Sequence, residues 1–168
     1  MAGSGDAGGN YASFSASLIR EEKLPKNWSL LLRSDAHWAT APLISNEQFP
    51  LGGAAGARGY QEGENYSDAG WRVTSDWRAP PLNIGAFPLA TTQVPAFVRP
   101  SLFMDYGEGY ELDRPNATTD RQWGTGFGMF LTAGAHFDAR LTLGWALHST
   151  PTTSAGGIQA CFSMGTQF

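Results

Sequence analysis

The sequence predicts an all-β protein, and within that class an antiparallel, up-and-down transmembrane β-barrel. Three observations lead to this prediction. Apolar and polar residues alternate in segment after segment, at the period of two that puts them on opposite faces of a strand. Charged residues are only 15% of the 168 residues, against about 25% in soluble domains, whereas aromatic residues are 12%. Aromatic side chains also stand at the ends of the apolar faces, where a membrane barrel has its interfacial girdles.

Seven segments alternate in this way, and each is about as long as the 9–11 residues that a strand needs to cross a bilayer. In the first, 11–20, serines at odd positions oppose apolar residues at even positions. The second, 28–40, has an apolar face that begins at Trp28 and ends at Trp38. The third, 69–78, likewise has a tryptophan toward each end of its apolar face.

The polar faces of the last four segments differ in character. Segment 96–107 places Asp105 on its polar face, whereas 122–133 has glycines there. Segment 137–148 alternates leucines with charged and hydroxyl residues. Segment 158–168 ends the chain on an aromatic residue. All seven segments therefore fit strands with one apolar and one polar face.

The connections between these strands alternate in length, as the short turns and long loops of outer-membrane barrels do. The connections 21–27 and 134–136 are short, and the connections on the opposite side are mostly longer. The longest of these contains the loop 43–67. The connection 79–95 is too long for the short side, and the pattern does not account for it.

A count of seven strands means that this chain cannot close a barrel alone. The first and last strands of a seven-stranded meander run parallel, whereas bacterial barrels have an even number of antiparallel strands. An open sheet would leave unpaired backbone groups in lipid. Either the alternation misses a strand or the chain is part of a larger barrel, and the second interpretation is favoured, with residues 1–10 as a glycine-rich loop remnant and 11–168 as the C-terminal part. A soluble β-sandwich that binds or adheres also alternates and stays as an alternative.

The composition excludes several other classes of protein. The net charge of −4 leaves no Lys/Arg surplus to neutralise nucleic-acid phosphates. The single cysteine, Cys161, cannot form an internal disulfide, and the three histidines lack the spacing of metal ligands. No group of residues forms an acid/base pair or an activated nucleophile. We therefore expect no catalytic residue, no metal and no cofactor, and thus no enzyme.

The long connection and the strands after it carry a recognisable set of motifs. They are Leu51-Gly52-Gly53, Ala57-Arg58-Gly59-Tyr60, Asp68-Ala69-Gly70, Phe103-Met104-Asp105-Tyr106-Gly107 and the terminal Phe168. In this order they resemble the sixth outer loop and following strands of the two-partner-secretion transporters of the haemolysin secretion/activation (ShlB/FhaC/HecB) family, within the BamA/TamA-like outer-membrane assembly superfamily. The chain departs from the family pattern at Ser67, where glycine is usual, and at Ala57, where valine is common.

The resemblance implies a fold, a location and partners. It covers about residues 11–168 and implies the last seven strands of a sixteen-stranded barrel in the bacterial outer membrane. The implied activity is export of a large secreted protein, and the alternative in the superfamily is an insertase that assembles outer-membrane proteins. The implied partners are outer-membrane lipid, the secreted substrate protein, and the assembly machinery that recognises Phe168. Upstream barrel strands and POTRA domains, which this chain does not contain, would complete the protein.

The loop motif also has a physical interpretation. Gly52, Gly53, Gly56 and Gly59 would let the backbone of loop 43–67 approach the barrel wall closely as the loop folds into the lumen. The planar fork of donors on Arg58 suits a bidentate pair with the Asp105 carboxylate, which the alternation points into the lumen. We therefore predict that Arg58 docks on Asp105, whereas the alternative is a solvated Arg58.

The other motif residues are predicted to belong to the same site, and the other polar-face charges are predicted to line the pore. Residues of the loop–strand motifs complete the site: Gly59, Tyr60, Asp68, Gly70, Phe103 and Gly107. Other charges on the polar faces are predicted to form structural pairs that line a water-filled or plugged pore. They are Arg33, Asp35, Arg72, Asp76, Arg78, Arg99, Asp138 and Arg140.

Overall fold

The protein is built on one curved antiparallel sheet. The computed structural model describes residues 10–89, 92–112, 119–135 and 137–166, so the predicted loop remnant 1–10, apart from its last residue, and Phe168 lie outside the described residues. The strands of the sheet are β1 (Ser13–Lys23), β2 (Ser29–Ala39), β5 (Ala69–Arg78), β6 (Leu82–Leu89), β7 (Thr92–Tyr110), β8 (Asp120–Ala133), β9 (Phe137–Ala146) and β10 (Ile158–Thr166).

Strand order follows the chain, as in an up-and-down barrel. The order is β1-β2-β5-β7-β8-β9-β10, and β6 pairs with β7 beside this path. A short 3₁₀ turn, η1 (Pro25–Asn27), joins β1 to β2. Two further strands, β3 (Phe49–Pro50) and β4 (Tyr66–Ser67), form a separate small pair in the connection between β2 and β5. In the described residues, no helix is long and apolar enough to cross a membrane.

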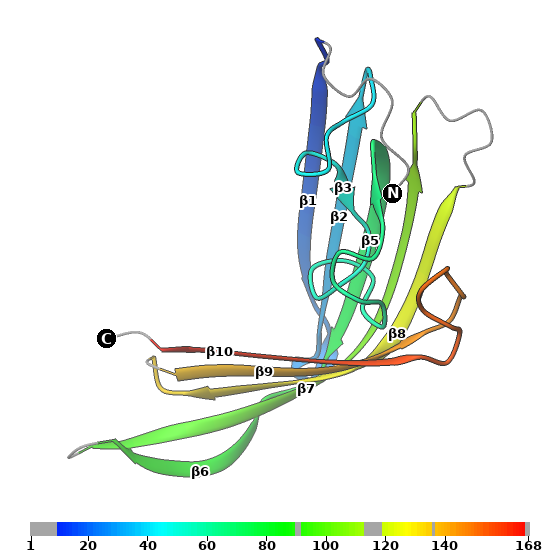
Figure 1. Ribbon diagram of the computed structural model, residues 1–168. Helices are drawn as coiled ribbons and strands as arrows, with labels where there is room; N and C mark the ends of the chain where they lie inside the picture. Colours follow the sequence, from blue (N-terminus) through cyan, green and yellow to red (C-terminus); the bar gives the residue numbers. More distant parts are fainter. Residues whose placement is uncertain (1–9, 90–91, 113–118, 136, 167–168) are drawn as a thin grey trace.

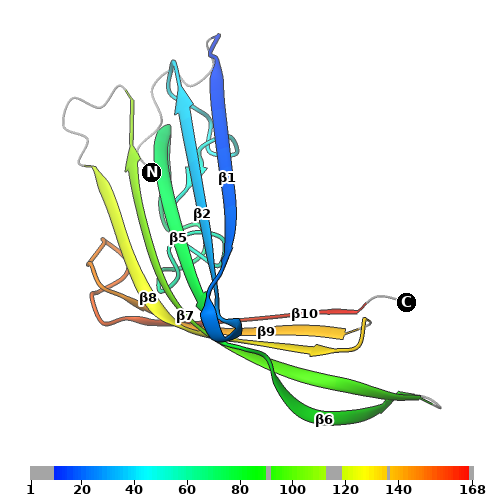
Figure 2. The ribbon, with the colours of Figure 1, turned by 180° about the vertical axis from the view of Figure 1, so that it is seen from behind.

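The sheet curls strongly, so that its first strands stand upright while β9 and β10 run across them (Figure 1). The connection between β2 and β5 lies on one face only, because it is in front of the strands in one view and behind them when the molecule is turned (Figure 2). We call this face the concave face and the opposite one the convex face. The sheet is a single layer and not the two facing layers of a sandwich, which removes the β-sandwich alternative.

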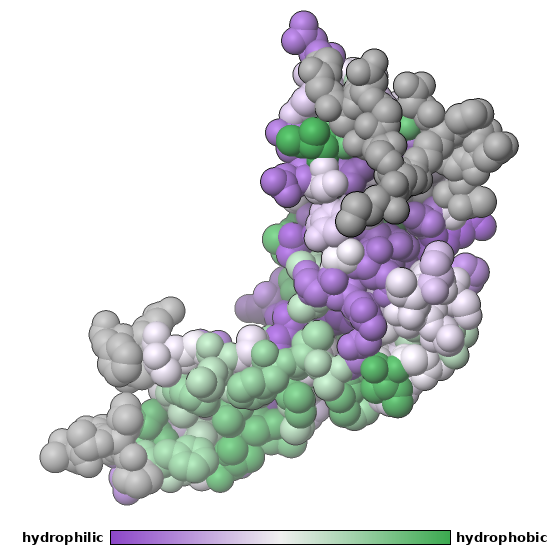
Figure 3. Space-filling model, in the orientation of Figure 1, coloured by the Kyte–Doolittle hydropathy of each residue, from purple (hydrophilic) through white to green (hydrophobic). Residues whose placement is uncertain are grey.

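The predicted alternation sorts the side chains between these two faces. The register pairs Phe14 with Trp38 on the convex face and Ser17 with Asp35 on the concave face. Large apolar side chains stay exposed on the convex face, Phe162 for example at 67%. Hydrophilic residues gather around the loop in the upper part of the molecule, and hydrophobic residues along the lower arm over β6, β9 and β10 (Figure 3).

The assignment of 79–95 to a connection between strands is wrong, because most of it is strand. β6 continues in line with β5, since both pair with the same edge of β7. The last β5–β7 pair is Arg78↔Ser101 and the first β6–β7 pair is Leu82↔Val98, with two prolines between them. A bulge follows between Asn83 and Gly85. The alternation did not reveal this strand because no charged residue occurs between Ala79 and Val98, so no polar face can be recognised in the sequence.

The other strand bounds differ from the predicted segments by a few residues. β5 matches residues 69–78, whereas β1 ends at Lys23 and β7 extends to Tyr110. The described part of β10 ends at Thr166. Seven strands follow one another across the sheet, as predicted. The eighth strand, β6, continues the line of β5 and so adds no further position to this order.

Candidate functional site

A loop of glycine-rich sequence packs on the concave face and forms the candidate site. The small β3–β4 pair is its stem, and residues 51–65 beyond the stem, here called the docked loop, lie against the sheet. Its inward side chains are fully covered, since Leu51 is 0% and Arg58 is 5% exposed. Because loops usually run over the protein surface, such burial requires specific partners for the loop's polar groups.

Arg58 and Asp105 form the central contact of the site, as the loop motif predicts. Arg58 Nε donates to Asp105 Oδ2 at 2.7 Å, and Nη2 donates to Oδ1 at 2.6 Å. The backbone N–H of Arg58 donates to Oδ2 at 2.9 Å. One carboxylate therefore holds both the side chain and the main chain of Arg58, which fixes its rotamer as well as its position.

A second carboxylate, Asp76 on β5, completes the guanidinium's partners. Arg58 Nη1 donates to Asp76 Oδ1 at 2.7 Å. The ring of Phe103 lies beneath the guanidinium, with Arg58 Cζ 3.7 Å from its centroid. Burial alone would lower the pKa of the Arg58 guanidinium, but Asp105 and Asp76 outweigh burial and raise that pKa. The arginine therefore stays charged and is held by two anions and one aromatic face.

Glycines of the wall let the loop backbone come this close. A Cβ at Gly124 of β8 would collide with the carbonyl oxygen of Arg58. A Cβ at Gly144 of β9 would lie 2.6 Å from the backbone nitrogen of Gly59. Gly59 itself has φ +109°, and a Cβ there would be 2.6 Å from the carbonyl carbon of Trp145. Gly124 of β8 and Gly144 of β9 thus form a surface without side chains, here called the glycine floor, against which the loop backbone lies.

Tyr60 joins the loop to the upper ends of β8 and β9. Its hydroxyl accepts hydrogen bonds from the backbone N–H groups of Trp123 and His148 at 3.0 and 3.2 Å, and donates to the His148 carbonyl at 2.8 Å. Its ring is 2% exposed and packs in a cluster with Ala57 and Ala146. The hydroxyl therefore satisfies backbone groups beyond the last regular β8–β9 pair.

Of the remaining loop glycines, Gly53 and Gly56 serve the internal shape of the loop, whereas Gly52 contacts the wall. A Cβ at Gly56 would meet the carbonyl group of Leu51, and Gly53 has φ +99°. A Cβ at Gly52 would lie 3.0 Å from the Gln122 side chain of β8. Of the four predicted positions, Gly59 and Gly52 therefore approach the wall, whereas Gly53 and Gly56 shape the loop's own turn.

Asp68 and the other residues of the strand motif hold the stem. The Asp68 carboxylate accepts from the backbone N–H groups of Leu43 and Leu112, both at 2.9 Å, and from the Gln48 amide at 3.0 Å. It therefore ties together the start of the loop and the end of β7. A Cβ at Gly70 would lie 2.6 Å from a β7 carbonyl oxygen, and one at Gly107 would touch Leu51.

A second arginine network holds the stem of the docked loop. Arg72 Nε and Arg33 Nε both donate to Asp35 Oδ2 at 3.0 Å, and Arg72 Nη1 donates to the Pro50 carbonyl at 2.9 Å. Ser17 donates to the other oxygen of Asp35 at 2.6 Å. These contacts fix the stem to β1, β2 and β5, so the docked loop is held at both ends.

Glu64 joins the docked loop to the neighbouring loop between β9 and β10. The hydroxyls of Thr150 and Thr153 donate to the Glu64 carboxylate, the latter at 2.5 Å. Burial alone would raise the pKa of Glu64, but these hydroxyl groups and the Gln61 N–H hold that pKa below its usual value. The ionised carboxylate therefore stabilises the contact between the two loops.

The structure brings together most of the predicted site residues and adds several that the sequence did not identify. The loop anchor, its glycines and the strand motif meet in one buried cluster, and only Phe168 lies outside the described residues. Asp76, Glu64 and Gln122 were not predicted at this cluster. Asp76 could have been found from the β5–β7 register, because it pairs with Phe103.

The polar-face charges divide into two groups. Asp35, Asp76 and their arginine partners form structural pairs as predicted. In the described part of the chain, Arg78, Arg99, Arg140 and Asp138 form no ion pair, so that prediction is wrong for these four.

Comparisons with known proteins give one family and one fold. A family model described as haemolysin secretion/activation protein ShlB/FhaC/HecB matches residues 5–131. Among solved structures, the chain is similar to CdiB from Escherichia coli, with a TM-score of 0.70 and 19% sequence identity. The alignment covers 93% of this chain and 27% of CdiB, so the likeness shows a shared fold over part of that protein. A search of curated proteins finds no match.

Proposed function

The chain belongs to the haemolysin secretion/activation protein ShlB/FhaC/HecB family, and from this premise we propose that it forms part of an outer-membrane β-barrel that exports a large secreted protein. In this proposal the convex face contacts bacterial outer-membrane lipid, and the concave face lines the pore. The docked loop then lies in the lumen, fixed to the wall by Arg58. The secreted protein passes beside it in an extended form.

The observation that carries the proposal is the burial of a charged loop anchor against the concave face. Removing one partner of a buried ion pair costs about 3–5 kcal/mol, because the other charge is left without compensation. Arg58 has two such partners, Asp105 and Asp76. A loop held this firmly keeps a fixed shape in the pore, which is what a defined passage for a polypeptide requires.

The proposal also assigns partners beyond this chain. β1 and β10 are the edges of the sheet in the described residues, and unpaired strand edges are not tolerated in lipid. We therefore assign further barrel strands to these edges and, from the family, POTRA domains on the periplasmic side. The outer-membrane assembly machinery is assigned to insert the completed barrel and to recognise Phe168.

Export by the intact protein tests this proposal. Arg58→Gln is expressed with the secreted partner, and secreted protein is measured in the medium while the barrel is measured in the outer membrane. We expect export to fall by more than about tenfold with the barrel still folded, because a cost above 1.4 kcal/mol shifts loop docking by that factor. Arg121→Gln is the matched control, since Arg121 lies on the convex side, where its exposed side chain pairs with Glu108.

Two results would contradict the proposal. Unchanged export by Arg58→Gln would show that the anchored loop is not needed for transport. A general loss of other barrel proteins from the outer membrane, without a specific loss of the secreted partner, would instead favour the insertase alternative.

A further inference from the structure

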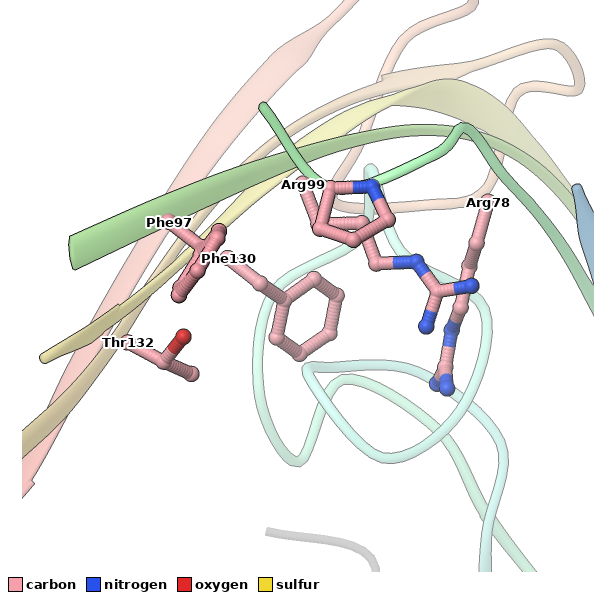
Figure 4. Close-up of a pocket in the computed structure, with 6 residues that line it drawn as sticks. Arg78, Phe97, Arg99, Phe130 and Thr132 are labelled. Carbon is pink, nitrogen blue, oxygen red and sulfur yellow. The ribbon is translucent and has the colours of Figure 1, made fainter. Parts of the chain in front are cut away.

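The lower half of the concave face carries a groove that the docked loop does not occupy. The groove encloses about 410 Å³ and is lined by Arg78, Pro81, Phe97, Arg99, Phe130 and Thr132. The two arginines and the Phe130 ring project from one side of their strands toward a common space (Figure 4). We propose that this arginine–phenylalanine groove binds carboxylate side chains of an extended polypeptide, with its two phenylalanine rings contacting the apolar residues beside them.

The first support is that two guanidinium groups flank one aromatic ring, and neither forms an ion pair in the part of the chain that the structure describes. Arg78 Cζ lies 5.2 Å and Arg140 Cζ lies 4.7 Å from the centroid of Phe130. Nε of Arg78 and Nε of Arg140 are both buried without a hydrogen-bond partner. Both arginines are nevertheless only part-buried, so the rest of each residue stays open to a ligand with acceptor oxygens.

The third arginine is fixed in place and keeps its charge uncompensated. Arg99 Nε donates to the Ala79 carbonyl at 2.9 Å, and Nη2 donates to Ser29 Oγ at 2.9 Å. Neither acceptor is charged, so these contacts orient the guanidinium without neutralising it. A positioned guanidinium can bind a carboxylate with little further loss of side-chain entropy.

The carboxylates of the concave face are already used elsewhere. Asp35 pairs with Arg33 and Arg72. Asp76 and Asp105 both pair with Arg58. Asp138 lies beside the groove, where it pairs in register with Thr132, but it is exposed and forms no ion pair among the described residues. Among the described residues, the groove and its margin therefore carry three arginines, Arg78, Arg99 and Arg140, against one carboxylate, Asp138.

Barrel strands added at the edges of the sheet cannot supply the missing anions to most of the groove. β7 and β8 lie fourth and fifth among the seven positions of the sheet. At about 4.8 Å between neighbouring strands, a strand added beyond β10 would be about 14 Å from β8, and one added beyond β1 would be about 19 Å from β7. The partner must therefore lie within the lumen rather than in the wall.

An extended polypeptide satisfies these conditions, and the inference rests on the proposed function because export would bring such a chain past the groove. Lipid is disfavoured because the groove is on the concave face. An extended chain can present an acidic and an apolar side chain close together. The carboxylate would then meet the arginines of the groove, and the apolar side chain would meet its phenylalanine rings. The substrate class is thus a polypeptide segment in which acidic residues occur beside apolar or aromatic ones.

Peptide binding to the intact barrel in detergent tests this inference without requiring export. The probe is a 12-residue peptide of repeated Asp-Phe-Ser carrying an uncharged fluorophore, and its counterpart has Lys in place of Asp. Fluorescence anisotropy should show that the acidic peptide binds at least about tenfold more tightly than the basic one, or about 1.4 kcal/mol. The double variant Arg78→Gln, Arg140→Gln should remove that preference.

Two controls make the result decisive. Arg78→Lys with Arg140→Lys keeps the charges and should keep most of the binding, which also covers the case in which the Gln variant fails to fold. Arg121→Gln on the convex face should bind like the unaltered protein. Equal binding of both peptides, or unchanged binding by the Gln variant, would overturn the inference. Since export is not measured, failure of the groove and failure of the transport proposal are separate outcomes.

Discussion

Arg58 and Asp105 are joined by three hydrogen bonds of 2.6 to 2.9 Å, although 47 residues separate them in the chain. Both are almost fully buried, with side chains 5% and 0% exposed. The contact fixes the middle of a long loop to β7. The loop therefore behaves as part of the wall and not as a mobile cover, which leads to specific expectations for variants.

Loss of Asp105 should be more damaging than loss of Asp76. Asp105→Asn replaces an acceptor of three hydrogen bonds from Arg58, whereas Asp76→Asn replaces an acceptor of one. We expect the free energy of loop docking to fall by about 3–5 kcal/mol for Asp105→Asn and by clearly less for Asp76→Asn. Protease cleavage within residues 51–65 of the folded barrel measures docking. Equal sensitivity of the two variants would contradict this ranking.

Adding one methyl group to the glycine floor should displace the loop. Gly124→Ala places a Cβ against the Arg58 carbonyl, which is backbone and cannot move without undocking the loop. Gly128→Ala is the matched control on the same strand and face, because its Cβ would meet only the Ser101 hydroxyl at 2.8 Å, a side chain that can rotate. Cleavage within the loop should rise for Gly124→Ala and not for Gly128→Ala. The reverse order would argue against close packing of the loop on β8.

Removing the Tyr60 hydroxyl should loosen the upper ends of β8 and β9. Tyr60→Phe keeps the buried ring but leaves the backbone N–H groups of Trp123 and His148 without their acceptor. An unsatisfied buried group costs about 1–3 kcal/mol. Hydrogen exchange of these two amides should speed up, while amides in the middle of β8 stay protected. No change at either amide would show that the hydroxyl is not their partner in solution.

Acid should separate the docked loop from the neighbouring loop. The pKa of Glu64 is lower in the folded protein than the ordinary 4.5, so its carboxylate stabilises the contact above that pH. This stabilisation is lost as the pH falls through the folded-state pKa, below about 4.5. Spin labels on residues 62 and 155 should move apart over that range. Glu64→Gln should already show the longer distance at neutral pH, and a distance independent of pH in both proteins would exclude the mechanism.

The strands and the central contact of the site could be predicted from the sequence for different reasons. Alternation of period two depends on local sequence alone, and β5 matched its prediction to the residue because both of its faces are clear. The pair of Arg58 and Asp105 followed from a motif resemblance together with the side of the strand on which Asp105 lies.

What could not be predicted depends on register or on contacts between loops. Asp76 is a partner of Arg58 because β5 and β7 place it opposite Phe103, two positions from Asp105, and no local pattern encodes that register. The contact between Glu64 and Thr150 joins two loops whose meeting depends on the curvature of the whole sheet. β6 was missed because its residues are uncharged and two prolines precede it, which hides the alternation.

A double-mutant cycle on Arg58→Ala and Asp105→Ala tests the central claim most directly. Loop docking in the intact barrel is measured by protease cleavage within residues 51–65 for the unaltered protein, both single variants and the double variant. If the two side chains anchor the loop together, the double variant should be little worse than either single one, with a coupling energy near the upper end of about 0.5–3 kcal/mol. Effects that add within about 0.5 kcal/mol would show that Arg58 and Asp105 do not act as a pair.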